Sequence, residues 1–229
     1  LTQGQLAISD ALTIAGPGAN LLTIKPGSSG TIFNISDGST ALIDVGLSGL
    51  ALVGTSTSPF PAAGHAITTA ENLTVADCVI SGNKSSARGT AIYSGLDSSL
   101  TIVGCTISNN TSLQDGGAIY KQSGSLAIEN SKLDGNTSRF NGGAIWAGSA
   151  DVVVTNSAIS NNTAGSGGGG GIYAFRGSLS VTASTINANS ARDGGGIYGL
   201  YVDPVNLTDT IISENSGIGP DSGPGPGGI

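Results

Sequence analysis

This sequence has few charged residues, no methionine and no long apolar run. Charged residues make up only 10% of the 229 positions, and with methionine absent the ordinary helix-forming residues are scarce. No run approaches the roughly 18 apolar residues of a transmembrane helix, and no signal peptide opens the chain. We therefore expect no direct membrane insertion by this segment, and any targeting or anchoring segment to lie outside the given sequence.

Basic residues, cysteine and histidine are also few. Eight Lys and Arg against 15 Asp and Glu give a net charge of −7 without a basic stripe, which argues against nucleic acid as a partner. Two cysteines and one histidine cannot form an ordinary zinc site, so we expect no metal and no cofactor. The single histidine, His65, has no Ser or Cys motif beside it to support a catalytic triad.

Glycine and small polar residues take the place of the missing types, and they repeat. Glycine occupies 38 positions, while the 38% of hydrophobic residues recur at regular intervals, which argues against disorder. The repeat has a period of 25 to 27 residues, and in six segments an asparagine follows ten residues after an apolar start. This column of asparagines predicts a hydrogen-bonded ladder at a turn, formed by Asn83, Asn110, Asn136, Asn162, Asn189 and Asn215.

Each repeat alternates apolar and polar residues, which is the period of a half-buried strand. In one repeat the pattern places four side chains inward on either side of a kink near Gly104, namely Leu100, Ile102, Cys105 and Ile107. Strands this short become stable only when successive coils stack at a spacing of about 4.8 Å, and three short strands per coil suit the period. The sequence therefore predicts an all-β parallel β-helix, a solenoid with about 26 residues per coil.

The repeat also predicts how the chain is divided. We expect a single β-helix domain over 1–216, with irregular starting coils in 1–70 and six regular coils in 71–216. Residues 217–229 are rich in glycine and proline and are interpreted as a tail or linker. A leucine-rich repeat also carries an asparagine ladder, but its period and its helix-forming segment do not occur here.

Two recurring motifs carry a family resemblance. The blocks Gly116-Gly117-Ala118-Ile119-Tyr120 and Gly142-Gly143-Ala144-Ile145-Trp146, together with the spaced asparagines, resemble bacterial right-handed parallel β-helix proteins that are secreted or displayed on the cell surface. Proteins with polymorphic outer-membrane-protein repeats are among them. The resemblance implies a right-handed coil and an extracellular or cell-surface location, and it points to location more than to chemistry.

One aromatic residue per coil follows the inward isoleucine, and this column is the candidate binding surface. It contains Tyr93, Tyr120, Trp146, Tyr173 and Tyr198, with Arg139 and Arg192 in nearby turns. If the rings face outward, they form a strip suited to stacking on a sugar or to receiving a partner. The alternative is an internal aromatic stack, or rings covered by the protein's own loops.

Two further groups stand out in the repeat. Cys78 and Cys105 share an inward column in adjacent coils, so they are either a disulfide or two buried thiols. Glu129, Lys132 and Asp134 fall on one coil, where a surface salt bridge is the simplest interpretation.

These features favour a noncatalytic structural or adhesive rod outside the cell, which binds carbohydrate or packs laterally on another surface protein. A carbohydrate-active enzyme, either a polysaccharide lyase or a hydrolase, is one alternative, but it requires clustered acids that the columns do not provide. A self-assembling fibre subunit is another, because the end of a solenoid exposes a strand edge to a further copy.

Overall fold

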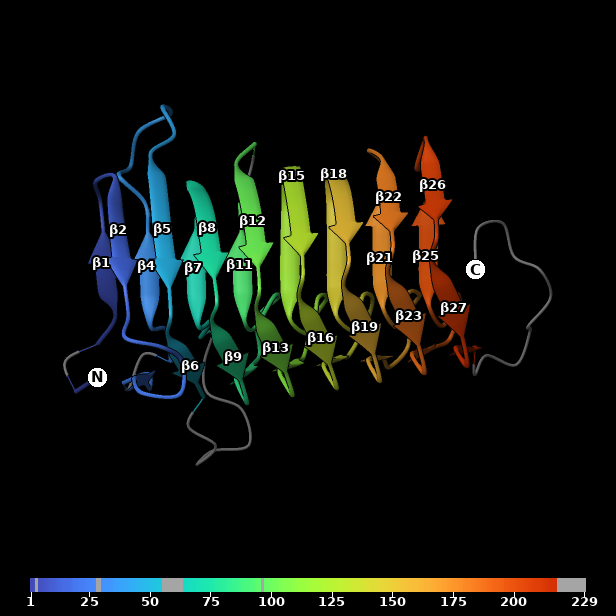
Figure 1. Ribbon diagram of the computed structural model, residues 1–229, viewed down its shortest axis with the longest axis horizontal. Coiled ribbons are helices and arrows are strands. Elements are labelled where there is room, and N and C mark those ends of the chain that lie inside the picture. The colour runs from blue at the N-terminus through green and yellow to red at the C-terminus, as the bar shows by residue number, and fades with distance from the viewer. Residues whose placement is uncertain (3, 28–29, 55–63, 96, 218–229) are drawn as a thin grey trace.

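The chain folds into a row of stacked coils built from strands and turns. The computed structural model describes residues 1–2, 4–27, 30–54, 64–95 and 97–217. Within these ranges no residue is helical, so no helix there could cross a membrane. Turns of roughly 27 residues lie side by side, with β1 and β27 at opposite ends of the row (Figure 1). The predicted all-β parallel β-solenoid is confirmed.

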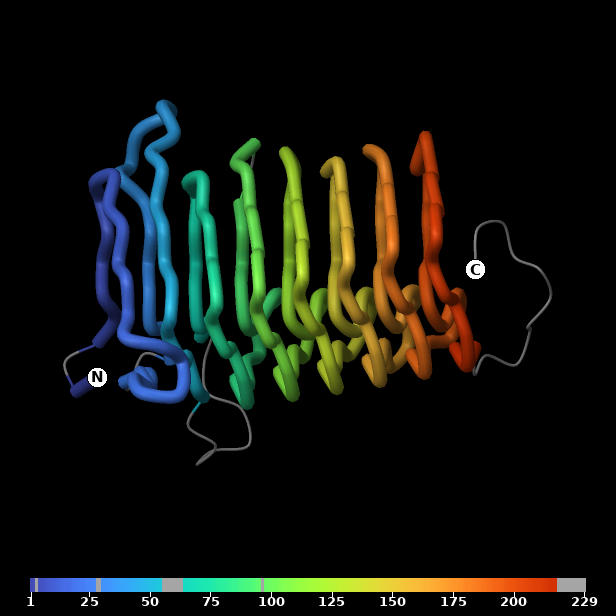
Figure 2. The backbone as a smooth tube through the Cα atoms, in the orientation of Figure 1, coloured from blue at the N-terminus to red at the C-terminus, as the bar shows by residue number. Residues whose placement is uncertain are grey.

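The largest sheet has 14 strands and contains the first two strand positions of each coil. The first position is held by β1 (Leu6–Ile8), β4 (Phe33–Ile35), β7 (Ile67–Thr69), β11 (Ile92–Ser94), β15 (Ile119–Glu129), β18 (Ile145–Thr155), β21 (Ile172–Phe175) and β25 (Ile197–Leu200). The second is held by β2 (Leu12–Ala15), β5 (Asp44–Ser48), β8 (Asn72–Ala76), β12 (Ser99–Val103), the second halves of β15 and β18, β22 (Leu179–Thr182) and β26 (Val205–Thr208). Figure 2 shows the resulting row of narrow coils.

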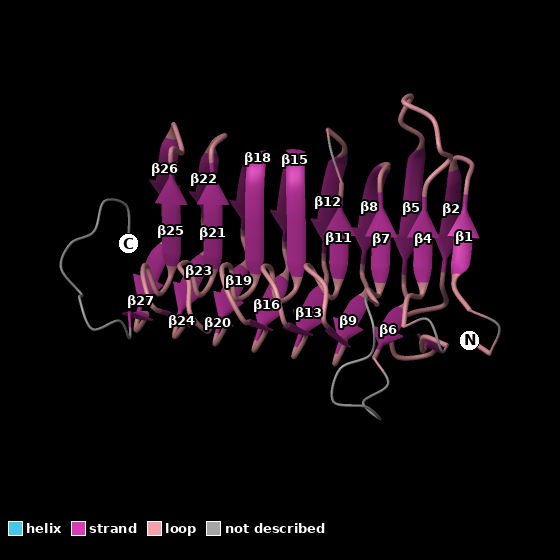
Figure 3. Cartoon of the chain, turned by 180° about the vertical axis from the view of Figure 1, so that it is seen from behind, coloured by secondary structure: helices cyan, strands magenta, loops and turns pink. Residues whose placement is uncertain are grey.

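Two smaller sheets complete each coil, and they are seen from behind in Figure 3. The eight-stranded sheet contains β3 (Thr23–Ile24), β6 (Ala51–Val53), β9 (Val79–Ser81), β13 (Thr106–Ser108), β16 (Lys132–Asp134), β19 (Ala158–Ser160), β23 (Thr185–Asn187) and β27 (Ile211–Ser213). The six-stranded sheet contains β10 (Lys84–Ser85), β14 (Thr111–Ser112), β17 (Thr137–Ser138), β20 (Thr163–Ala164), β24 (Ser190–Ala191) and β28 (Ser216–Gly217). Regular coils thus have four strand positions rather than the expected three, because the two residues after each ladder asparagine also pair.

Neighbouring strands are parallel and in register, so equivalent residues of successive coils lie beside one another. In the first position Ile119 pairs with Ile92 on one side and with Ile145 on the other. In the second position Leu126 pairs with Leu100 and with Val152. Because parallel strands in register lie about 4.8 Å apart, each inward residue packs against a residue of similar shape in the next coil.

The predicted kink is a single left-handed residue between the second and third strands. Gly104 has a φ of +62° and lies between β12 and β13. The same position in other coils is held by Asp77, Asn130, Asn156, Ala183 and Asp209, all with φ between 47° and 50°. Glycine, asparagine and aspartate adopt this conformation most readily, which explains most of the column.

The apolar side chains that the pattern placed inward form one continuous core. Leu100, Ile102, Cys105 and Ile107 are all buried, as predicted. The columns on either side continue this core into the neighbouring coils, for example through Leu126 and Ile128. A chain with few large residues is therefore held together by many small, aligned apolar contacts, which follow from stacking rather than from a compact centre.

The asparagine column forms the predicted ladder along one corner of the interior. Asn110 is typical, because its backbone N–H and its side-chain Nδ2 donate to Oδ1 of Asn136 at 3.1 and 3.0 Å. Its Nδ2 also donates to the carbonyl of Ile80 in the preceding coil at 3.1 Å. The same pattern runs from Asn83 to Asn215 without a break. Each amide therefore connects three successive coils.

The first 70 residues follow the same architecture with longer turns. Leu12 pairs with Val45, and Val45 with Leu73, so the irregular coils stay in register with the regular ones. At the other end Gly217 still belongs to β28, where it pairs with Ala191. The rest of the predicted tail, 218–229, lies outside the described residues.

The ladder predicts a large stability loss when one amide is removed. We expect Asn136→Ala to lower the free energy of unfolding by about 3 kcal/mol, because the substitution leaves the buried N–H and Nδ2 of Asn110 without their acceptor. Urea unfolding followed by circular dichroism measures this value. Asn206→Ala, on an exposed strand, is the matched control and should change it by less than about 0.5 kcal/mol. Equal losses for the two variants would contradict this role of the ladder.

Candidate functional site

The aromatic column lies on the outer side of the first strand position. Each ring follows an inward isoleucine, so the alternation of the strand turns it outward. The pairs are in register: Tyr93 lies beside Tyr120, Tyr120 beside Trp146, and Trp146 beside Tyr173. Tyr173 and Tyr198 continue the column on β21 and β25. The structure thus brings all five predicted rings together.

The rings stack on one another rather than lying flat on the sheet. Consecutive centroids are 5.4, 4.2, 6.4 and 5.3 Å apart, and the planes differ by 10° or less. Rings lying side by side in one plane would need centroids more than about 6 Å apart to avoid overlap of their carbon atoms, and three of the four distances are shorter. Most of the ring faces are therefore covered by neighbouring rings, and the column presents mainly ring edges. This aromatic ladder is stacked, as in the alternative considered from the sequence, but it lies on the outer side of the strands and not in the interior.

Neighbouring side chains fix the start of the aromatic ladder. The His65 ring lies 5.5 Å from Tyr93, and its Nδ1 lies 3.0 Å from the carbonyl of Gly89. Arg88 lies over the Tyr120 ring at 5.3 Å and forms an ion pair with Asp115 at 3.5 Å. Burial lowers the pKa of His65 and raises the pKa of Tyr120. These groups lie against the first two rings of the ladder, Tyr93 and Tyr120.

The two arginines predicted in turns near the rings are both exposed. Arg139 is exposed and lies over Phe140, with its guanidinium carbon 5.4 Å from the ring centroid. Arg192 is also exposed, in the turn after β24. Arg88, which the repeat pattern did not single out, lies over a ring of the aromatic ladder. Ligand binding at the five rings and these two arginines stays a prediction.

Cys78 and Cys105 are buried free thiols that belong to a second ladder. The N–H of Cys78 donates to Sγ of Cys105 at 3.4 Å, and the N–H of Cys105 donates to Oγ of Ser131 at 3.0 Å. Ser131 and Ser157 repeat the contact with the hydroxyl of the next coil. Contact with Cys78 and burial raise the pKa of the Cys105 thiol. The thiols thus occupy places that serine holds further along, and in this structure they form no disulfide, as in the alternative of two buried thiols.

A buried lysine was missed by the sequence analysis. Lys121 on β15 is fully buried, and its Nζ donates to Oγ of Ser94 at 3.0 Å and to Oγ of Ser98 at 2.9 Å. Burial lowers its pKa to about 8, while the nearby Asp97 carboxylate acts in the opposite direction. The signal was present, because the residue two positions after the inward Ile119 must also point inward.

Glu71 is a second buried charged residue that the pattern did not reveal. Its carboxylate accepts hydrogen bonds from the backbone N–H groups of Asp37 and Ile43, at 3.2 and 3.1 Å. It therefore holds both ends of the long turn between β4 and β5. Lys121 bonds to the turn between β11 and β12, and Glu71 bonds to the turn between β4 and β5. Each buried charge thus fixes a turn of irregular length from the inner side.

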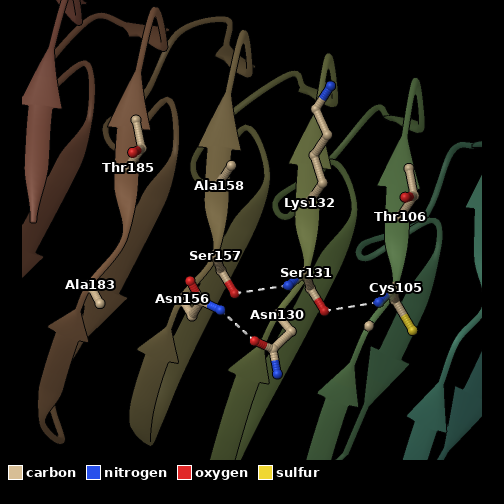
Figure 4. Close-up of a pocket in the computed structure, with 11 residues that line it drawn as sticks. Cys105, Thr106, Asn130, Ser131, Lys132, Asn156, Ser157, Ala158, Ala183 and Thr185 are labelled. Carbon is tan, nitrogen blue, oxygen red and sulfur yellow. Dashed lines mark hydrogen bonds between the residues drawn. The ribbon is translucent and has the colours of Figure 1, made fainter.

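A shallow groove of about 470 Å³ follows the bend between the second and third strands (Figure 4). It is lined by exposed amides and small side chains, among them Asn130, Asn156, Thr106 and Thr185. The Nδ2 of Asn156 donates to Oδ1 of Asn130. Side chains of adjacent coils are therefore hydrogen-bonded on the surface as well as in the interior. Lys132, the charged residue of this lining, forms the expected salt bridge with Asp134 at 3.1 Å.

The comparison with protein families identifies the fold. The family described as right handed beta helix region matches residues 10–215. The chain therefore belongs to this family. Neither the curated proteins nor the solved structures contain a significant match.

The buried lysine predicts a stability that rises at alkaline pH. Its pKa is about 8 in the folded chain and 10.5 without burial, so between these values the unfolded state binds more protons. From pH 7 to pH 10 we expect the free energy of unfolding to rise by about 2 to 3 kcal/mol relative to Lys121→Met, which has no proton to lose. Urea titrations of both proteins at each pH measure this difference. If the free energies of unfolding of the two proteins changed with pH in parallel, burial would not lower the pKa of Lys121 in the folded chain.

Proposed function

We propose that this right-handed β-helix acts outside the cell as a noncatalytic rod, which holds binding side chains at fixed spacing and adheres to carbohydrate or to another surface protein. The observation that carries the proposal is the set of unbroken side-chain ladders. Asparagine, hydroxyl or thiol, and aromatic columns each continue from coil to coil. Such columns fix the rise and register of the coils, which is what a rigid spacer needs.

The finer family resemblance supports the proposed extracellular location. The Gly-Gly-Ala-Ile blocks and the spaced asparagines resemble polymorphic outer-membrane-protein repeats of bacterial surface proteins. The low content of charged residues, 10%, and the abundance of glycine support the same assignment. An extended surface of small neutral side chains suits contact with sugars or lateral contact with a partner, since little charge has to be desolvated.

The groove supports binding more than catalysis. Glycoside hydrolysis needs two carboxylic groups facing the scissile bond. Among the groove residues named above, the side chains are amides and hydroxyls, and Lys132 is paired with Asp134. Amides and hydroxyls bind sugar hydroxyls through hydrogen bonds but do not transfer protons efficiently at neutral pH.

A retention experiment tests the proposal. The chain is immobilised on beads and incubated with a panel of bacterial and host-cell polysaccharides and with intact cells, and the recovered polysaccharides are sized by chromatography. We expect retention of at least one polysaccharide or cell type with no change in chain length. Shortened polysaccharide would identify an enzyme, and absence of retention across the panel would contradict an adhesive role.

A further inference from the structure

A half-buried ring and two exposed residues at one turn form an aromatic and cationic cluster apart from the aromatic ladder. Phe175 ends β21 and Arg176 follows it, while Tyr201 follows Leu200 at the end of β25. Phe175 pairs with Leu200, so Arg176 and Tyr201 hold the same turn position in adjacent coils, about one strand spacing apart. β21 and β25 are neighbours near one end of the row (Figure 1).

Tyr201 differs from the ladder rings in the orientation and exposure of its ring. It is 75% exposed, and its ring meets Phe175 at an angle of 74° with centroids 6.0 Å apart. This edge contact fixes the ring without covering both of its faces. A sugar ring stacks its apolar C–H groups on an open aromatic face, which Tyr201 offers and the stacked rings of the aromatic ladder do not.

Arg176 supplies an oriented cation beside this ring. Its guanidinium carbon lies 5.0 Å from the centroid of Phe175, and the side chain is exposed. In the part of the chain that the structure describes, Arg176 forms no ion pair, unlike Arg88 with Asp115 and Lys132 with Asp134. Stacking on Phe175 orients the planar guanidinium and leaves its donors to solvent, where they match a carboxylate.

The backbone at this turn is strained for the side chains that it carries. Arg176 and Tyr201 have φ angles of +66° and +58°. The left-handed region costs a non-glycine residue about 1 to 2 kcal/mol, and bulky side chains are rare in it. The turns after β4 and in β15 use glycine in this region, at Gly38 and Gly124, and the turn after β11 uses the small polar residue Asp97. An arginine and a tyrosine at such positions are better explained by the groups they present than by turn geometry.

We propose that Phe175, Arg176 and Tyr201 bind an acidic saccharide, with a sugar ring on Tyr201 and its carboxylate on Arg176. This inference rests on the proposed adhesive function and gives it a ligand class. The net charge of −7 does not prevent local binding, because at physiological salt interactions between exposed charges are screened beyond about 8 Å. The ligand is therefore recognised by contact and not by long-range attraction.

Titration with a matched pair of oligosaccharides tests this site. The probes end in glucuronate or in glucose, and binding to the full chain is measured by calorimetry at two salt concentrations. We expect the glucuronate probe to bind more tightly, and its binding to weaken about tenfold in Tyr201→Ala but not in Tyr201→Phe, which keeps the ring. Arg176→Gln should make the two probes bind equally, since it removes the cation but not the ring.

The chain contains its own control. Phe140 is an exposed ring with a guanidinium beside it, that of Arg139, in another turn. Phe140→Ala, the matched control for Tyr201→Ala, should leave binding unchanged, and the circular dichroism spectra of all variants should match. Equal binding of both probes to the unsubstituted chain, no binding of either, or an equal loss in Phe140→Ala would overturn the inference. The adhesive function would still stand if the beads retained polysaccharide, so the two failures are distinguishable.

Discussion

The structure depends on the hydrogen bonds that each ladder asparagine makes to the next coil. Two donors of one residue, the backbone N–H and Nδ2, share the Oδ1 of the following asparagine, while Nδ2 also reaches back to a carbonyl. Such a side chain is satisfied only when the coils are in register, because a shift by one residue would leave buried amide groups without partners. The ladder therefore fixes the register of the strands on both sides of it, and the apolar columns, the hydroxyl ladder and the aromatic ladder follow from that register.

The repeat predicted the fold well because stacking converts sequence period directly into spatial columns. The inward positions around Gly104 and the asparagine ladder were identified from spacing alone. The repeat did not predict the fourth strand position, because two residues such as Thr111 and Ser112 carry no period of their own. Nor did it predict that Trp146 would stack on Tyr120, since a column fixes where a residue lies but not its side-chain rotamer. Lys121 has inward parity and could have been found, whereas nothing in the pattern marked Glu71 as buried.

The same register separates the structural residues from those available for binding. Residues that form ladders cover one another, as the aromatic ladder does, so repetition reduces the surface that a regular column offers to a ligand. Departures from the repeat are more informative. Arg176 and Tyr201 occupy a turn position where side chains are costly, and they are exposed beside Phe175. In a solenoid of this kind, function is expected where the columns are interrupted and not where they are most regular.

Amide hydrogen exchange measured by mass spectrometry is the most direct test of the central role of the asparagine ladder. The backbone N–H groups of Asn110, Asn136 and Asn162 are buried and bonded to the next side chain, so they should exchange only through global unfolding and be among the slowest in the chain. In Asn136→Ala, protection should fall first at Asn110, which loses its acceptor. If the ladder amides exchanged as fast as those of exposed turns, register would have to be held by another interaction.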